Sequence, residues 1–381
     1  MKIVFDCRYT RLERHDGISR YTAELVTALA RLTPVTMLIS DERQLTMLPD
    51  LPWIMGTDPT SLREPWVSRI VARSEPDVVF TPMQTMGSVG RRYRFILTLH
   101  DLIYYSNRRP PREFSWPVRM GWRVYHLSYL PVRMLLARAD AVVTGSFSSR
   151  DEIVAARLTS RPITVVRSAV DAPKPEASER ARPTRKELVY MGSFMPYKNV
   201  ETIARALWLL PGYRLRLLSR VLPRERARLE RIAPSGSLLF HDGVSDEEYL
   251  RILASATALV SASRQEGFGI PLVESMAAGT PVVVSDIPVF HEIGGEAAHY
   301  FAPDDERALA EAVLRLDMPG EWERHSLLSV AAAAEFSWEH SARTLYELAL
   351  SLVGATAEDL QSGETATQDE ALNETAAKHA N

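Results

Sequence analysis

The sequence predicts an α/β protein in which two doubly wound parallel sheets face each other across a cleft. Short runs that are apolar throughout alternate with segments whose apolar residues recur at helical spacing. The alternation is interrupted once by a stretch rich in proline and charge, and then it starts again. This pattern favours two Rossmann-like domains in series, with ligands bound at the carboxyl ends of the strands, in the cleft.

The first domain is expected over residues 1–171. A helix should follow its first strand over about residues 18–32, because Leu25, Leu29 and Leu32 share one helical face. Residues 172–186 carry the proline and the charge, and they are the expected linker. The expected strands of this domain are Ile3–Phe5, Val35–Ile39, Asp77–Thr81, Phe95–Asp101, Ala141–Gly145 and Ile163–Val166.

The second domain is expected over residues 187–336. A last helix over residues 337–353 has one apolar stripe and is expected to pack back towards the first domain. Residues 354–381 are acidic and lack aromatic residues, which predicts a disordered tail. The expected strands of this domain are Leu188–Met191, Leu215–Leu218, Leu238–Phe240, Ala258–Ala262, Val282–Asp286 and His299–Phe301.

Composition excludes several classes of protein. Of the 381 residues 46% are apolar and 24% are charged, which is typical of a soluble globular protein. The net charge of −3 gives no general attraction to nucleic acid, and the single Cys7 allows neither a disulfide framework nor a cysteine zinc site. No apolar run approaches the length of a membrane-spanning helix, and the first residues do not form a signal peptide. We therefore expect a cytoplasmic protein that is at most attached to a membrane face.

The stretch from Arg264 to Glu274 carries the strongest functional signal. It follows a buried strand, and a helix is expected to begin near Pro271 and to end at Gly279 before the next strand. Glu266 lies in the glycine-containing loop, and Glu274 is expected in the first turn of the helix. Because one loop and one helix hold both carboxylates, we expect them to bind hydroxyls of one ligand rather than flank a scissile bond as in a hydrolase.

The motif Glu266-Gly-Phe-Gly-Ile-Pro-Leu-Val-Glu274 resembles the glutamate-pair signature of the retaining glycosyltransferases of family 4. Members of that family have the GT-B fold, which consists of two facing Rossmann-like domains. The resemblance extends over nearly the whole folded chain, from Gly17 to Trp338. It implies that Glu266, with the glycine loop of Gly267, Phe268 and Gly269, holds the donor sugar, and that Glu274 accepts hydrogen bonds from the nucleotide ribose.

Lys198 follows the first strand of the second domain and precedes a helix. A cation at this position can stabilise a departing diphosphate, and family members resemble this chain in having a lysine there. Many of them also have an arginine nearby, where this chain has Ser193 or Tyr197. Arg264 and Arg220 are the candidates for completing the phosphate site.

Two motifs of the first domain carry weaker signals. Gly17 opens the first helix, and the resemblance places its loop near the diphosphate and the acceptor, although Asp16 replaces the usual second glycine. His100 and Asp101 end a strand, so His100 is either a structural histidine or, as we expect, a contact of the donor sugar. Asp101 would orient that histidine or cap the next segment. Ser146, Ser148 and Ser149 follow another strand, and Ser149 is expected to open a capping box.

The region from Arg108 to Arg138 contains seven arginines, one acidic residue and interleaved aromatic residues. One interpretation is a helix with a core face and a solvated basic face. The other is a surface that contacts anionic lipid or a lipid-linked acceptor. RNA binding is less favoured because no RNA-binding motif accompanies the charge.

The sequence thus predicts a retaining glycosyltransferase of bacterial polysaccharide or glycolipid assembly. The donor is predicted to be GDP-mannose, with a UDP-sugar as the alternative, and the acceptor a glycan or a lipid-linked glycan. No Asp-x-Asp motif occurs in the cleft segments, so neither a metal nor another cofactor is expected. A GT-B epimerase and an inactive binding subunit are the other classes that remain. The catalytic candidates are Lys198, Glu266 and His100, and the donor-binding candidates are Gly17, Ser193, Arg264, Gly267, Phe268, Gly269 and Glu274.

Overall fold

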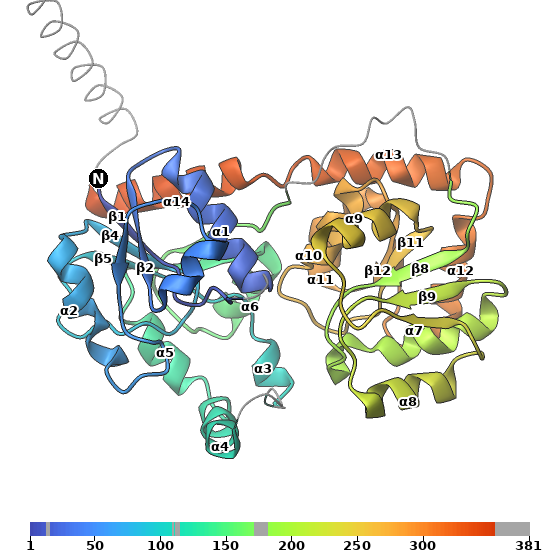
Figure 1. The fold of residues 1–381 in the computed structure, drawn as a ribbon, viewed down its shortest axis with the longest axis horizontal. Helices are drawn as coiled ribbons and strands as arrows, with labels where there is room; N and C mark the ends of the chain where they lie inside the picture. Colours follow the sequence, from blue (N-terminus) through green and yellow to red (C-terminus); the bar gives the residue numbers. More distant parts are fainter. Residues whose placement is uncertain (13–15, 109, 111–114, 171–181, 355–381) are drawn as a thin grey trace, which may run out of the picture.

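The protein has two lobes, each built around one parallel sheet (Figure 1). The computed structural model describes residues 1–381 except 13–15, 109, 111–114, 171–181 and 355–381. The predicted tail and most of the predicted linker therefore lie outside the described residues. The two sheets confirm the predicted α/β class with two doubly wound domains.

The first sheet has seven strands in the order β3-β2-β1-β4-β5-β6-β7. The chain leaves β1 in one direction and returns on the other side of it at β4, so the topological switch point lies between these strands. The strands are β1 Ile3–Asp6, β2 Val35–Ile39, β3 Trp53–Met55, β4 Val78–Thr81, β5 Arg94–Thr98, β6 Ala141–Thr144 and β7 Ile163–Val165.

The second sheet has six strands in the order β10-β9-β8-β11-β12-β13. Its switch point lies between β8 and β11, so the loops that follow these two strands open at the same edge of the sheet. The strands are β8 Glu187–Tyr190, β9 Arg214–Leu217, β10 Leu238–Phe240, β11 Ala258–Ser261, β12 Val282–Ser285 and β13 Ala298–Phe301.

Helices cover both sheets, and the last two run along one side of the molecule (Figure 1). Helix α14 crosses to the first lobe and packs on α1, where the rings of Trp338 and Tyr21 lie 5.9 Å apart. The helices of the first lobe are α1 Gly17–Ala30, α2 Val67–Val71, α3 Ile103–Ser106, α4 Trp116–Tyr125, α5 Leu130–Leu136 and α6 Phe147–Ala155. The others are α7 Val200–Ala206, α8 Pro223–Ile232, α9 Asp246–Ser255, α10 Ile270–Ala277, α11 Pro288–Gly294, α12 Glu306–Arg315, α13 Glu321–Ala333 and α14 Trp338–Val353.

Two local predictions were wrong, and a third holds for only one of the two helices that it concerned. Glu274 is the fifth residue of α10, so it lies beyond the first turn and the helix dipole does not account for it. The cap of α6 is Ser146, whose hydroxyl accepts from the amide of Ser149, so Ser149 lies inside the helix. Helix α4 buries none of its residues and so has no core face, whereas α5, in the same arginine-rich region, buries Val132 and Leu136 as that interpretation expected.

The ring of His299 on β13 packs at a tilt against that of His325 of α13, with the ring centroids 4.0 Å apart. Burial, and to a smaller extent the neighbouring His325, lowers the pKa of His299 to about 4. In an unfolded chain a histidine titrates near pH 6.5. The ring is therefore neutral in the folded protein over a pH range in which the unfolded chain binds a proton.

This difference predicts acid destabilisation. Above about pH 6.5 the ring is neutral in both states and the low pKa does not affect stability; as the pH falls from 6.5 towards 4, the unfolded chain binds the proton first and the free energy of unfolding falls. One proton changes the free energy of unfolding by at most about 1.4 kcal/mol per pH unit, and partial exposure of the ring reduces this. In urea titrations between pH 4.5 and 7.5, His299→Phe should flatten the profile, whereas a variant of the exposed His340, His340→Gln, should not. Identical slopes for His299→Phe and the wild type would contradict the assignment.

Candidate active site

The candidate site is built where the loops after β8 and β11 meet the first lobe. Residues 262–269, which we call the Glu266 loop, connect β11 to α10. Gly269 has φ +104°, a conformation that strongly favours glycine, and a Cβ atom there would lie 3.0 Å from the Phe290 ring. A Cβ atom on Gly267 would lie 2.7 Å from Oδ2 of Asp101. Glycine at these two positions therefore lets the loop turn sharply and approach the first lobe closely.

Glu266 and Lys198 form an ion pair at the switch point of the second sheet. Nζ of Lys198 lies 2.5 Å from Oε1 of Glu266, and the hydroxyl of Ser263 donates to the same oxygen at 2.7 Å. Both side chains are largely buried, with 17% and 12% of their surfaces exposed. The structure thus brings two of the three catalytic candidates into direct contact.

His100 ends the strand segment after β5 on the facing lobe. Its Nε2 lies 2.8 Å from the carbonyl oxygen of Pro82, and because a carbonyl can only accept, this nitrogen carries the proton. Burial lowers the pKa of His100, so the ring is neutral and Nδ1 is left as an acceptor. Burial also raises the pKa of Asp101, whose Oδ1 accepts from the amide of Ile103 at 2.9 Å. Asp101 therefore caps the segment that follows and lies directly against the Glu266 loop.

Glu274 is bound by an arginine of the other lobe. Arg20 of α1 donates from Nη1 to Glu274 at 2.5 Å and from Nη2 to Asp246 at 2.9 Å. The Glu274 side chain is only 6% exposed, and burial raises its pKa while Arg20 opposes the change. Arg20 follows the Gly17 loop, but no role was expected for it from the sequence, because a contact across 254 positions has no local signal.

The candidate residues for the donor phosphate site differ in the contacts that they already make within the protein. Arg264 is held by Asp304 at 2.5 Å and by the carbonyl of Pro196 at 2.9 Å, both within its own lobe. Ser193 accepts a hydrogen bond from Tyr190 through its carbonyl and lines the cleft. Arg220 also lines the cleft, so it is better placed than Arg264 to meet an anionic ligand. Gly17 lies at the start of α1, where a Cβ atom would be 3.5 Å from Ile270, the first residue of α10.

Two serines hold the Glu266 loop from the opposite lobe. The hydroxyls of Ser146 and Ser149 both donate to the carbonyl oxygen of Gly267, at 2.8 and 3.2 Å. Ser146 also caps α6, so one hydroxyl joins a helix terminus of the first lobe to the loop of the second. From the sequence, a capping role was expected for Ser149 and no role for Ser146. The loop that carries Glu266 and Phe268 is thus fixed from both lobes.

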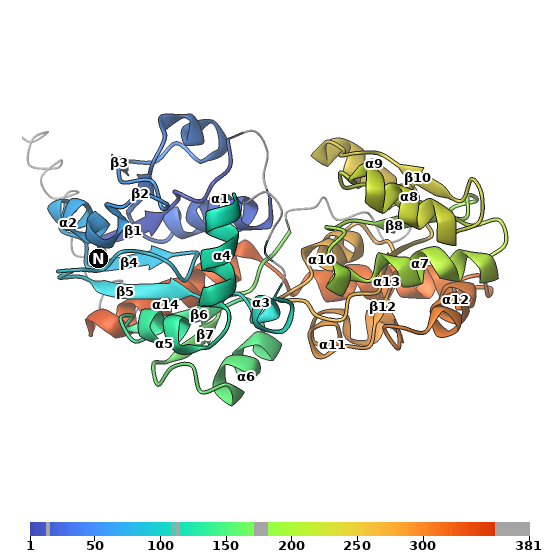
Figure 2. The same cartoon turned by 90° about the horizontal axis from the view of Figure 1, so that it is seen from below.

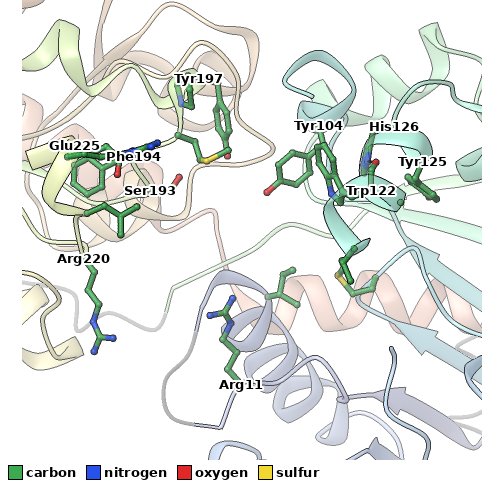
Figure 3. A pocket seen from close by; sticks show the side chains of 18 of the residues that line it. Arg11, Tyr104, Trp122, Tyr125, His126, Ser193, Phe194, Tyr197, Arg220 and Glu225 are labelled. Carbon is green, nitrogen blue, oxygen red and sulfur yellow. Dashed lines mark hydrogen bonds and ion pairs between the residues drawn. The ribbon is translucent and has the colours of Figure 1, made fainter. Parts of the chain in front are cut away.

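A cavity of about 1650 Å³ lies between the lobes beside these residues. One side is formed by aromatic residues of the first lobe, including Tyr104, Trp122 and His126, and the other by the segment from Ser193 to Tyr197 and by α8 (Figure 3). Lys198 and Glu266, which form an ion pair with each other, do not line this cavity. We call this space the cleft cavity.

No three His, Cys, Asp or Glu side chains come together as a possible metal site in the described ranges. The carboxylates of the site are instead engaged by cations: Glu266 by Lys198, and Glu274 by Arg20. The site therefore contains carboxylates that can accept hydrogen bonds from ligand hydroxyls, one ammonium group and the backbone amides of a glycine loop. These groups lie near the carboxyl ends of the strands, where ligands of α/β proteins bind.

Comparison with known proteins agrees with this geometry. The model of Glycosyltransferase Family 4 matches residues 15–173, and that of Glycosyl transferases group 1 matches residues 185–317. The chain is 26% identical to the O-antigen chain mannosyltransferase RfbU of Salmonella typhimurium over 318 residues, which cover 79% of this chain and 87% of the relative.

Solved structures show the same fold. Sucrose-phosphate synthase from Thermosynechococcus elongatus superposes with a TM-score of 0.70 at 20% identity, covering 93% of this chain and 99% of that chain. The Anabaena protein HepE in complex with UDP and glucose gives 0.69 at 18% identity, covering 92% of this chain and all of that chain. With a family 4 domain followed by a group 1 domain on the GT-B fold, the chain belongs to the family 4 glycosyltransferases.

Proposed function

We propose that this glycosyltransferase transfers mannose from GDP-mannose, with retention of the anomeric configuration, to a glycan or a lipid-linked glycan of the cell envelope. The observation that carries the proposal is the Lys198–Glu266 pair of the second lobe, which lies across the cleft from the neutral His100. The relationship to an O-antigen mannosyltransferase supports mannose as the sugar.

The proposed reaction exchanges one bond at the anomeric carbon for another on the same face of the sugar. The bond to the donor phosphate breaks, the bond to the acceptor oxygen forms, and the acceptor proton passes to the departing phosphate oxygen. Lys198 would stabilise the charge on that diphosphate, while Glu266 and Nδ1 of His100 accept hydrogen bonds from sugar hydroxyls. No residue of this chain is required as a covalent nucleophile, so positioning and charge stabilisation supply the catalysis.

The donor can be identified by thermal-shift titration with GDP-mannose, UDP-glucose and ADP-glucose. GDP-mannose should raise the melting temperature most. A larger shift with UDP-glucose would indicate that the donor is a UDP-sugar. The structure of the neighbour HepE in complex with UDP supports this alternative. If none of the nucleotide sugars shifts the melting temperature, the protein is better explained as an inactive binding subunit. Release of free nucleotide diphosphate in the absence of any acceptor would favour the epimerase.

Glu274→Ala should weaken binding of the nucleotide about tenfold or more, because the ribose hydroxyls would lose a charged acceptor. In the absence of nucleotide Arg20 occupies this carboxylate, so Arg20→Ala removes a competitor and should not weaken nucleotide binding. Calorimetry of GDP with both variants separates the two effects. Unchanged affinity in Glu274→Ala would remove the ribose role from Glu274.

We further propose that the enzyme attaches to the cytoplasmic face of an anionic membrane through α4 and α5. Among the described residues, no helix has the length and apolar character needed to cross a bilayer. Figure 2 shows α4 on the side of the first lobe that faces the second lobe. Arg119, Arg123, Arg133 and Arg138 alternate with exposed apolar side chains, a pattern that fits an anionic lipid surface. The most exposed of these are Trp116, Val124, Leu127, Leu130 and Met134, each more than half exposed.

Vesicle flotation tests this attachment. The wild type should float with vesicles that contain anionic lipid and should float much less with neutral vesicles. Replacing Trp116 and Val124 by serine should reduce flotation severalfold, whereas Trp208→Ser should not, because that tryptophan, which is also mostly exposed, lies on the second lobe. Equal flotation with both kinds of vesicle, or none, would contradict the proposal.

A further inference from the structure

Arginines of the second lobe form one side of the cleft cavity. Arg224, Arg228 and Arg231 recur at helical spacing on α8, so their side chains share one face, and that face lines the cavity. Arg220 precedes the helix and lines the same space, and Arg11 approaches from the first lobe (Figure 3). We call these five residues the arginine cluster.

Carboxylates only partly neutralise the arginine cluster. Glu225 is the one acidic residue among the described side chains that line the cavity, and it lies 3.4 Å from Arg224. Arg228 pairs with Glu201 at 2.5 Å, and Arg11 pairs with Asp16 at 2.5 Å.

Arg220 and Arg231 have neither an ion pair nor a side-chain hydrogen bond in the described part of the chain, and both are exposed to the cavity. The cavity therefore has a surplus of positive charge, part of which is not committed to any internal contact. Guanidinium groups bind phosphate oxygens in a bidentate manner, so the surplus fits a phosphorylated ligand.

Four residues of the cluster, Arg11, Arg224, Arg228 and Arg231, have no part in the site that we assign to the donor diphosphate, whereas Arg220 is also a candidate for that site. Lys198 is paired with Glu266 outside the cavity lining, whereas Arg224, Arg228 and Arg231 of α8 line the cavity. The cavity of about 1650 Å³ is larger than the roughly 300–1000 Å³ usual for one small ligand. Opposite α8 lie Tyr104, Trp122 and His126, whose rings contact one another, with Trp122 and His126 4.0 Å apart. Such a surface suits the faces of sugar rings.

We propose that the arginine cluster binds a phosphate or diphosphate group of the acceptor, so that the enzyme's acceptor is an anionic phosphosugar conjugate rather than a neutral glycan. This inference rests on the proposed function, since it concerns the second substrate of the same transfer. The group could belong to a lipid diphosphate or to a soluble sugar phosphate. Both sources present the same oxygens to the cluster.

The test is calorimetric titration of pyrophosphate into the enzyme saturated with the nucleoside diphosphate that the donor screen selects. The donor phosphate site is then filled, and pyrophosphate should still bind. The double variant Arg224→Gln/Arg231→Gln should bind pyrophosphate at least about tenfold more weakly, because two charged hydrogen-bond donors to the phosphate oxygens are lost. Its affinity for the nucleoside diphosphate should stay within about twofold of the wild type.

Arg226→Gln is the matched control. Arg226 lies on α8 but not in the cavity lining, since it pairs with Glu230 at 3.0 Å and covers the Phe240 ring at 4.7 Å. Its loss should leave pyrophosphate binding within about twofold. Octyl diphosphate in place of pyrophosphate distinguishes the sources: tighter binding indicates a lipid-linked acceptor, and equal binding indicates a soluble phosphate.

Two results would overturn the inference. One is the absence of pyrophosphate binding once the nucleotide site is filled. The other is a double variant that loses nucleotide affinity instead, because the arginines would then belong to the donor site. Neither result would affect the proposed function, whose failure shows separately as the absence of any nucleotide-sugar binding.

Discussion

Lys198→Ala should lower kcat by about 100- to 1000-fold while the affinity for the donor changes little. Removal of one preorganised group that stabilises transition-state charge has an effect of this size. Lys198 lies at the carboxyl end of β8, and its pairing with Glu266 fixes Nζ next to the sugar-binding loop. Charge on the leaving diphosphate develops only as the bond to the sugar breaks, so the loss should affect kcat more than binding.

Lys186→Ala is the control for this prediction. Lys186 precedes β8, is more exposed than Lys198, and pairs with Asp317 at 3.0 Å away from the cleft. Turnover by this variant should be close to that of the wild type. Steady-state rates with the donor identified by thermal shift, together with calorimetric donor affinity, give the comparison. If Lys198→Ala retains the wild-type rate, or loses donor affinity as much as rate, Lys198 does not act on the leaving group.

The alternation of buried strands and helices was sufficient to predict the two sheets, because parallel strands covered on both faces must be apolar throughout. The strand that it missed, β3, lies at the edge of the first sheet. Trp53 and Met55 of that strand are about 40% exposed, so the segment has no buried run that would mark it. Apolar patterns in the sequence reveal a strand only where its residues are buried. Strand β3 escapes detection because it is held chiefly by its pairing with β2.

The candidate site was only partly predictable. Lys198 and Glu266 could be found because each follows a strand next to the switch point of one sheet, and that position depends on local sequence order. Their direct contact could not be found, nor could Arg20 on Glu274, since both depend on how distant segments are oriented. The absence of a core face on α4 was missed for a related reason: its aromatic residues line the cleft or face solvent.

Gly267→Ala should reduce kcat/KM by about 100-fold or more without a comparable loss of stability. A Cβ atom at this position would lie 2.7 Å from Oδ2, 3.2 Å from Cγ and 3.0 Å from Cβ of Asp101, so either the loop or the aspartate must move. The loop cannot swing away freely, because Ser146 and Ser149 of the other lobe hold the carbonyl of Gly267. Glu266 would be displaced with it, and a shift of about 1 Å at a positioned group can lower a rate by about 100-fold.

The matched control is Gly145→Ala, which adds the same methyl group beside the site but into open space. That variant should keep most of the wild-type activity. Initial rates at subsaturating donor, combined with melting temperatures of both variants, separate a displaced loop from a destabilised fold. Because Glu274 lies on α10 beyond the loop, nucleotide affinity should fall much less than turnover in Gly267→Ala. Wild-type turnover in Gly267→Ala would mean that the close approach of the Glu266 loop to Asp101 is not needed for the reaction. The loop would then have to reach its active position by opening away from the first lobe.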